Sequence, residues 1–282
     1  MRIANLAGRA VLLVQDGAVD IHKASEGALD PDPGALFERW EEVRPLLVGL
    51  AGECVPYAER DLLAPVPSPR QIFAIGVNYE GHAEEAELAA PAVSGCPVTF
   101  TKFASCLTGP DSDVVLPPGM VDWEVELVAV IGRAAHRVPA EGAWAHVAGL
   151  TIGQDLTERI TQWSGPTPQQ FSLGKSYPGF GPLGPAVVTL EEFDDPGDLR
   201  IGCSVNGVTM QDASTSDMIF NVPELVARLS AIVPLLPGDL IFTGTPAGIG
   251  ATRVPAVFLK NGDELVSHIE GIGTLRTTFG EG

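Results

Sequence analysis

Residues 121–127 read VDWEVEL and continue directly into the apolar run VAVIG at residues 128–132. Side chains two apart in a strand point to the same side, so Glu124 and Glu126 share one side and their apolar neighbours share the other. The apolar run is typical of a strand that is covered on both faces. A solvated strand face would also explain two acids. In a covered strand, however, unpaired carboxylates are costly to bury, so this segment indicates a nearby cation.

The chain around this segment is rich in short strand patterns separated by Gly/Pro turns. Six such runs lie at residues 71–79, 122–132, 147–156, 184–190, 201–207 and 239–246. Helical patterns interrupt them at residues 81–90 and 222–233. Strands at this spacing favour a sheet-rich sandwich or barrel over alternating βαβ units.

The first 63 residues differ in texture from the rest. Residues 9–21 predict a hairpin, and residues 33–50 predict a helix with proline near both ends. The segment APVPSPR at 64–70 is a stiff, proline-rich connector. We therefore expect a small N-terminal domain (1–63), a linker (64–70) and a catalytic domain (71–282).

Composition limits the classes of partner. The 282 residues carry a formal charge of −19, which argues against binding of nucleic acid or of anionic membranes by the bulk surface. No apolar run approaches the length of a membrane span, and the first residues lack the pattern of a signal peptide. The four cysteines are scattered. We expect them to be reduced thiols in a cytoplasmic protein.

Asp155 ends the apolar strand pattern at 147–156 and is the first candidate partner for the two glutamates. Together with Glu124 and Glu126 it would form an all-oxygen set, which suits Mg²⁺, Mn²⁺ or Ca²⁺ rather than Zn²⁺. On local grounds alone, Asp155 could equally be a turn residue at the end of the strand.

Other side chains with catalytic potential lie elsewhere in the chain. His82 and Glu85 are three apart in a helical pattern, so they can meet and activate a water; a surface helix pair is the alternative. Lys175 lies among small and apolar residues and needs an anion or an ion-pair partner. The glycine-rich segment TGTPAGIG at 243–250 lacks the spacing of a nucleotide-binding loop, which leaves a structural turn or a site loop.

Several ordered motifs resemble those of the fumarylacetoacetate hydrolase superfamily, over about residues 71–279. They are GVNYEGHAEEAE (76–87), DWEVELVAVIG (122–132), QDLTERITQ (154–162), LGKSYPGFGPLGP (173–185), MQDASTSDMIF (210–220), LLPGDLIFTGTPAGIG (235–250) and NGDELVSHIEGIG (261–273). The resemblance implies an α+β, mostly β fold: a mixed β-sandwich or roll behind a small N-terminal α+β domain. It also implies a homodimer that binds Mg²⁺ or Mn²⁺, and in some members Ca²⁺.

The resemblance also assigns roles to individual residues. The metal ligands become Glu124, Glu126 and Asp155, and the catalytic residues become His82, Glu85 and Lys175. The substrate-binding candidates are Tyr79, Arg159, Gln162 and Thr245. Two positions depart from the family pattern, because Ile160 and Pro178 stand where many members have acids. Both changes remove charge near the expected pocket.

These observations predict a divalent-metal-dependent hydrolase that cleaves a C–C bond in a small 2,4-dioxo acid of the acylpyruvate type. The same metal-enolate chemistry would serve an oxaloacetate decarboxylase or an isomerase of an unsaturated 2-oxo acid. A non-catalytic metal-binding relative is the third alternative. The expected partner is thus a small 2-oxo acid, not nucleic acid or a membrane.

Overall fold

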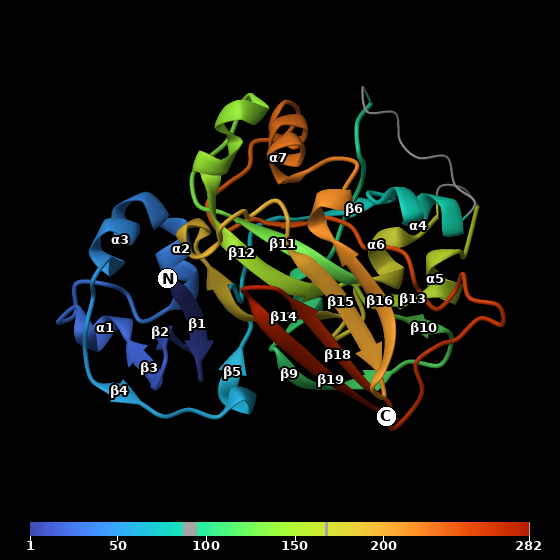
Figure 1. The fold of residues 1–282 in the computed structure, drawn as a ribbon, viewed down its shortest axis with the longest axis horizontal. Coiled ribbons are helices and arrows are strands. Elements are labelled where there is room, and N and C mark those ends of the chain that lie inside the picture. The colour runs from blue at the N-terminus through green and yellow to red at the C-terminus, as the bar shows by residue number, and fades with distance from the viewer. Residues whose placement is uncertain (87–94, 167–168, 282) are drawn as a thin grey trace.

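The computed structural model describes residues 1–86, 95–166 and 169–281. Its described strands form a large mixed sheet, a second sheet of five strands and a short two-stranded ribbon. Figure 1 shows the N-terminal elements on one side of the molecule and the five-stranded sheet in front of the large one. The α+β, mostly β architecture expected from the sequence is confirmed.

The large sheet runs from the N-terminal unit into the centre of the molecule. In spatial order its strands are β4 (Cys54–Val55), β3 (Gly17–Asp20), β2 (Arg9–Val14), β1 (Arg2–Leu6), β14 (Gly181–Val188), β12 (Val147–Gln154), β11 (Val125–Ile131), β17 (Leu240–Phe242), β6 (Ile72–Gly76) and β7 (Val98–Thr101). Two short strands lie off this path: β5 (Leu62–Leu63) pairs with β1, and β8 (Leu107–Thr108) pairs with β14.

The second sheet covers one face of the first. Its order is β16 (Val208–Ser214), β15 (Arg200–Val205), β18 (Glu264–Ile269), β19 (Gly273–Glu281) and β9 (Asp111–Leu116). The ribbon joins β10 (Val121–Asp122) to β13 (Thr157–Glu158).

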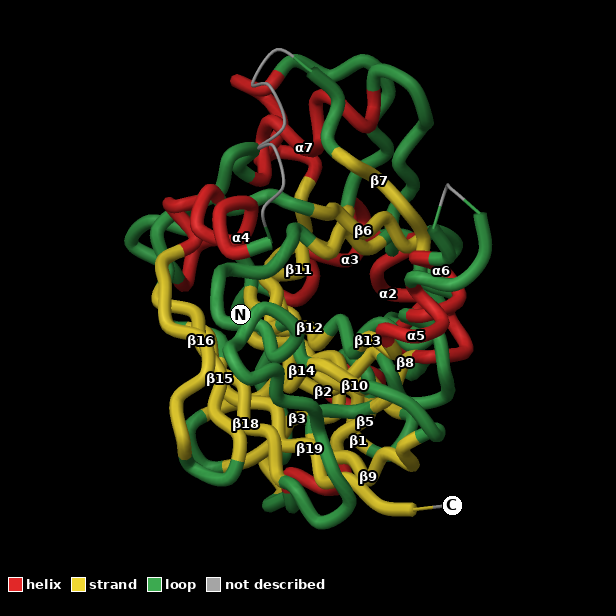
Figure 2. The backbone as a smooth tube through the Cα atoms, turned by 90° about the vertical axis from the view of Figure 1, so that its right-hand side faces the viewer, coloured by secondary structure: helices red, strands yellow, loops and turns green. Residues whose placement is uncertain are grey.

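The helices are short. They are α1 (Ile21–Ala24), α2 (Pro33–Glu38), α3 (Trp40–Leu47), α4 (Glu80–Glu85), α5 (Arg159–Gln162), α6 (Phe171–Gly174) and α7 (Val222–Ser230), with 3₁₀ turns η1 (Glu59–Asp61), η2 (Ala104–Cys106), η3 (Ala140–His146), η4 (Leu190–Glu192) and η5 (Thr215–Asp217). Helices α4, α5 and α6 lie on the right-hand side of Figure 1, the side that faces the viewer in Figure 2. None of the helices in the described part of the chain is long and apolar enough to cross a membrane.

Strand β11 is central because it is buried along all seven of its residues. Leu127 and Ala129 pack into the core shared with the five-stranded sheet, whereas Val128 and Val130 pack into the core shared with the N-terminal elements. The alternation is that of a strand with a hydrophobic layer on each face. Glu126 falls on the side of Val128, where the apolar layer gives way to a polar site.

Two expectations about the helices need comment. The single helix expected at 33–50 is wrong: Arg39 leaves the helical conformation, and the chain forms α2 and α3, so that the rings of Phe37 and Trp40 stack 5.7 Å apart. The helix expected at 81–90 is present in its first part as α4, which ends at Glu85. Residues 87–90 lie outside the described residues.

Strand β1 was not anticipated. It pairs with β14, so the N-terminal strands and the central strands share one sheet. The division of the chain at residues 64–70 stays a prediction.

Candidate active site and metal centre

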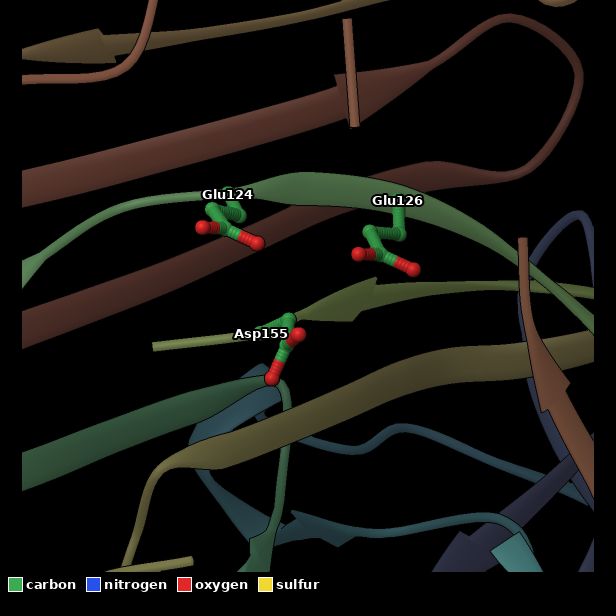
Figure 3. Close-up of side chains that lie close together, drawn as sticks. All are labelled: Glu124, Glu126 and Asp155. Carbon is green, nitrogen blue, oxygen red and sulfur yellow. The ribbon is translucent and has the colours of Figure 1, made fainter. Parts of the chain in front are cut away.

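Strand pairing brings three carboxylates together. Glu126 lies in β11 and Glu124 directly precedes it, while Asp155 directly follows β12, the antiparallel neighbour of β11. The amide of Asp155 donates to the carbonyl of Glu124 at 2.9 Å. One ligand oxygen from each carboxylate lies within 4.8 Å of the others, and all three side chains are buried. Figure 3 shows the three carboxylates converging between the two strand ends.

Lys175 bridges two carboxylates of this cluster. Its Nζ donates to Glu124 Oε2 and to Asp155 Oδ2, each at 2.7 Å, and to the hydroxyl of Thr157 at 2.8 Å. These three bonds use all three protons of a lysine ammonium group. We expected this buried lysine to have an anion as its partner, and that partner is the acid cluster.

Arg159, at the start of α5, forms a second bridge. Its Nη2 lies 2.7 Å from Asp122 Oδ2 and 2.8 Å from Glu124 Oε1, and its Nη1 donates to Gln162 Oε1 at 3.0 Å. Asp122 also accepts from the amide of Gly250 at 2.7 Å. Sequence reasoning missed Asp122 as a site residue, although it is the first acid of the opening motif. In the sequence, Asp122 was counted only as one of the three acids of that motif, and no role was assigned to it.

Lys102 is a second buried lysine, to which the sequence assigned no role. Its Nζ lies 2.7 Å from Asp155 Oδ1, and it also donates to the carbonyls of Phe180, at 3.1 Å, and Lys175. Burial lowers the pKa of Lys102, but the nearby charge of Asp155 outweighs it and the pKa is raised overall. Lys102 therefore remains a cation that orients one oxygen of Asp155. The scarcity of lysine in this chain was the available signal.

The glutamates experience opposite electrostatic environments. Burial raises the pKa of Glu124, but Lys175 and Arg159 outweigh it and lower the pKa to about 2. Burial also raises the pKa of Glu126, and repulsion from Asp155 and Glu124 raises it well above the usual value. Repulsion of this kind is what a bound divalent cation would relieve. The all-carboxylate donor set and its surplus of negative charge therefore fit a hard divalent ion.

His82 and Glu85 form the pair that their spacing predicted. His82 Nδ1 lies 2.8 Å from Glu85 Oε1, and both side chains are largely buried on α4. Burial raises the pKa of Glu85, but hydrogen bonds from His82 and the amide of Gly248 outweigh it and lower the pKa. Glu85 therefore orients the imidazole ring through Nδ1, with Nε2 as the ring atom that remains for proton transfer.

The segment 243–250 is a site loop whose glycine amides bind carboxylates. Gly244 N–H donates to Glu126 Oε2 at 2.8 Å, and Gly248 N–H donates to Glu85 Oε2 at 2.8 Å. Gly244 and Gly248 have φ values of +95° and +108°, a conformation that glycine adopts without strain. With the bond from Gly250 to Asp122, three glycines of this loop each orient one acid of the site.

A cavity of about 280 Å³ opens beside these groups. Of the residues that sequence analysis singled out, His82, Glu124, Arg159, Gln162, Lys175 and Thr245 line it. Ile160 and Pro178 are exposed and are not part of its lining. A larger cavity of about 520 Å³ lies beside the N-terminal strands, but none of the predicted catalytic or metal-binding residues lines it.

The hydroxyl groups of two substrate-binding candidates are not free to bind a ligand in the cavity as the structure stands. The hydroxyl of Thr245 donates to the carbonyl of Val125 at 2.9 Å. Tyr79 is buried and does not line the cavity; its hydroxyl has no hydrogen-bond partner among the described residues. Burial and the charge of Glu126 raise the pKa of Tyr79, so it stays a neutral phenol.

Comparison with known proteins places this site in context. Residues 71–280 match the family model described as fumarylacetoacetate (FAA) hydrolase C-terminal. The mitochondrial oxaloacetate tautomerase FAHD2A of Bos taurus is 44% identical over 223 residues, which cover 78% of this chain and 70% of that protein. A crystal structure of a Mycobacterium smegmatis protein has a TM-score of 0.93 and 47% identity, covering 100% of this chain and 99% of the other.

Maleylpyruvate hydrolase from Sphingobium sp. SYK-6 adds chemical information. Its crystal structure contains manganese(II) and pyruvate; the TM-score is 0.80 at 30% identity, with full coverage of both chains. A manganese-bound neighbour and the buried acid cluster together support a divalent metal, without deciding between Mg²⁺, Mn²⁺ and Ca²⁺.

The expected cytoplasmic location is contradicted by these comparisons, because the bovine relative and a human relative are named as mitochondrial proteins. The expectation had rested on scattered cysteines and on the first residues, neither of which distinguishes the cytoplasm from other reducing compartments. The match over residues 71–280 and the identity to relatives show that this chain belongs to the fumarylacetoacetate hydrolase superfamily and is an enzyme of that family.

Proposed function

We propose that this protein is a divalent-metal-dependent enzyme that interconverts the keto and enol forms of a small 2-oxo acid. The observation that carries the proposal is the buried cluster of Glu124, Glu126 and Asp155, of which Glu124 lines the same cavity as the histidine base His82. The 44% identity to an oxaloacetate tautomerase supports it. Keto–enol interconversion is nearer to the isomerase that was an alternative prediction from the sequence than to the C–C bond hydrolase that was the main prediction.

The proposed division of labour follows from the contacts. A divalent ion held by the three carboxylates would supply a Lewis acid for the carboxylate and 2-oxo oxygens of the substrate. His82, oriented by Glu85, would take a proton from C3 on its Nε2 and deliver it to the 2-oxo oxygen, which gives the enol; the reverse transfer gives the keto form. Lys175 and Arg159 would hold the ionised state of Glu124 and keep the site rigid. Gln162 and Thr245 would contact the substrate at the cavity wall.

Cleavage of an acylpyruvate is the second candidate, and one observation favours it. His82 and Glu85, 2.8 Å apart, are also the arrangement that deprotonates a water. The maleylpyruvate hydrolase neighbour shares the fold at 30% identity. In this reaction the same histidine would activate water to attack the distal carbonyl, and no new residue would be needed. A homodimer, expected from the family resemblance, stays a prediction.

The two reactions separate in one experiment. Exchange of the C3 protons of oxaloacetate and of pyruvate into D₂O would be followed by NMR with Mn²⁺ or Mg²⁺, against blanks without enzyme. An acylpyruvate would be assayed in parallel for cleavage. We expect enzyme-dependent exchange, lost on chelation of the metal. Absence of exchange with every 2-oxo acid tested would refute the proposal, and cleavage without exchange would favour the hydrolase.

A matched pair of variants tests the base. His82→Gln should reduce the exchange rate by about 10²–10⁴-fold, the usual effect of losing a general base. His268→Gln is the control, because His268 is an exposed residue of β18 outside the cavity. Equal exchange rates in both variants would remove His82 from the mechanism.

A further inference from the structure

An aromatic wall begins directly beside the charged cluster. Phe100 of β7 lies with its ring centroid 5.4 Å from Lys175 Nζ, and the ring of Phe171 on α6 is 5.5 Å from that of Phe100. Trp163, which directly follows α5, lines the same cavity as both rings. The amide of Gln170 donates to the carbonyl of Gln162 at 2.9 Å, so the ends of α5 and α6 that carry these aromatic residues are joined.

The wall is completed by aliphatic side chains. Ile75, Val98 and Ile249 line the cavity next to the aromatic residues. The volume of about 280 Å³ is close to the lower end of the range of about 300–1,000 Å³ typical of ligand pockets. A small molecule that binds the acid cluster would therefore place its remaining atoms against this apolar wall.

The cations at the cavity are already engaged. Among the described residues that line it, the basic side chains besides His82 are Arg159 and Lys175. Lys175 donates hydrogen bonds to Glu124, Asp155 and Thr157. Arg159 contacts Asp122, Glu124 and Gln162. A carboxylate placed against the wall would lose its hydration without gaining a cation, which is unfavourable.

We propose that the enzyme acts on 2-oxo acids whose C3 carries an aryl group, with phenylpyruvate as the model compound, in preference to dicarboxylates such as oxaloacetate. The inference rests on the proposed keto–enol function and adds the class of substrate. A flat ring can lie against Phe100, Phe171 and Trp163, and burial of its apolar surface strengthens binding. The second carboxylate of oxaloacetate would find no uncommitted lysine or arginine among the described residues of that surface.

The direct test compares two substrates on one preparation. Exchange of C3 protons into D₂O would be measured for phenylpyruvate and for oxaloacetate, each with Mn²⁺ and each corrected for the blank. We expect kcat/KM for phenylpyruvate to exceed that for oxaloacetate by about 10- to 100-fold, the effect of burying an aryl side group. Exchange with oxaloacetate at an equal or higher kcat/KM overturns the inference and leaves the proposed function standing. Failure of both substrates refutes the proposed function itself.

Two variants test whether the wall is responsible. Trp163→Ala should lower the ratio of phenylpyruvate to oxaloacetate activity, and Trp163→Arg should lower it further by offering oxaloacetate a cation. Trp163 is 48% exposed, so both variants should fold, which circular dichroism would check. Phe103→Ala is the matched control, because Phe103 is 49% exposed and lies outside the cavity. A ratio that is the same in Trp163→Ala, Trp163→Arg and Phe103→Ala overturns the inference.

Discussion

Replacing Lys102 by methionine removes a fully buried charge while keeping a side chain of similar length. In the native protein its Nζ is paired with Asp155 Oδ1 at 2.7 Å, and neither side chain is exposed. Loss of one partner of a buried ion pair typically costs about 3–5 kcal/mol, because the other charge is left uncompensated. Asp155 keeps its bond to Lys175, so we expect a value near the lower end of that range.

The free energy of unfolding would be measured by urea titration with a chelator present, so that no bound metal replaces the lost charge. Lys260→Met is the control, since Lys260 is exposed and surface substitutions usually change stability by less than about 0.5 kcal/mol. If Lys102→Met loses less than about 1 kcal/mol, the buried pair does not stabilise the site in the way that its geometry indicates.

Three further predictions concern the metal, the loop and an acid outside the site. Mn²⁺ at a hundredfold excess over its dissociation constant should stabilise the native protein by about 2.7 kcal/mol in thermal unfolding, and Glu126→Gln should lose most of this gain. Gly248→Ala should lower the unfolding free energy by about 1–3 kcal/mol and slow C3 exchange, because the side chain strains a backbone with φ of +108° that orients Glu85; unchanged exchange would contradict this. The hydrogen bond from Arg9 lowers the pKa of Asp20, so its stabilising contribution is present above the unfolded pKa and lost as the pH falls through the folded value. Asp20→Asn should therefore lose less stability than the native protein between about pH 6 and about pH 3 in urea titrations.

The acid cluster could be predicted from the sequence because the alternation of side chains along a strand depends only on neighbouring residues. Glu124 and Glu126 share a side by their spacing alone, and Asp155 could be added because it ends an apolar strand. The pairing of β11 with β12, which brings Asp155 to the other two, depends on sheet register and required the structure. The spacing of His82 and Glu85 predicted their contact for the same local reason.

The parts that the sequence did not reveal depend on contacts between distant segments. Lys102 meets Asp155 across 53 residues, and no local pattern links them. The aromatic wall likewise combines β7 with the ends of α5 and α6, and Phe100, Trp163 and Phe171 carry no common motif. Conversely, Ile160 and Pro178 were placed near the pocket by the family resemblance, whereas both are exposed in the structure.

The glycine loop at 243–250 has a mechanical consequence. Its main-chain amides orient Glu126 in the acid cluster, Glu85 behind the histidine and Asp122 behind the arginine. Because one segment holds all three, a small displacement of it would alter metal affinity, basicity and charge balance together. Main-chain donors also do not titrate, and among single substitutions only one to proline removes them. For engineering, substitutions in this loop should therefore affect metal binding, the histidine base and the arginine together. Substitutions in the aromatic wall should change substrate preference alone.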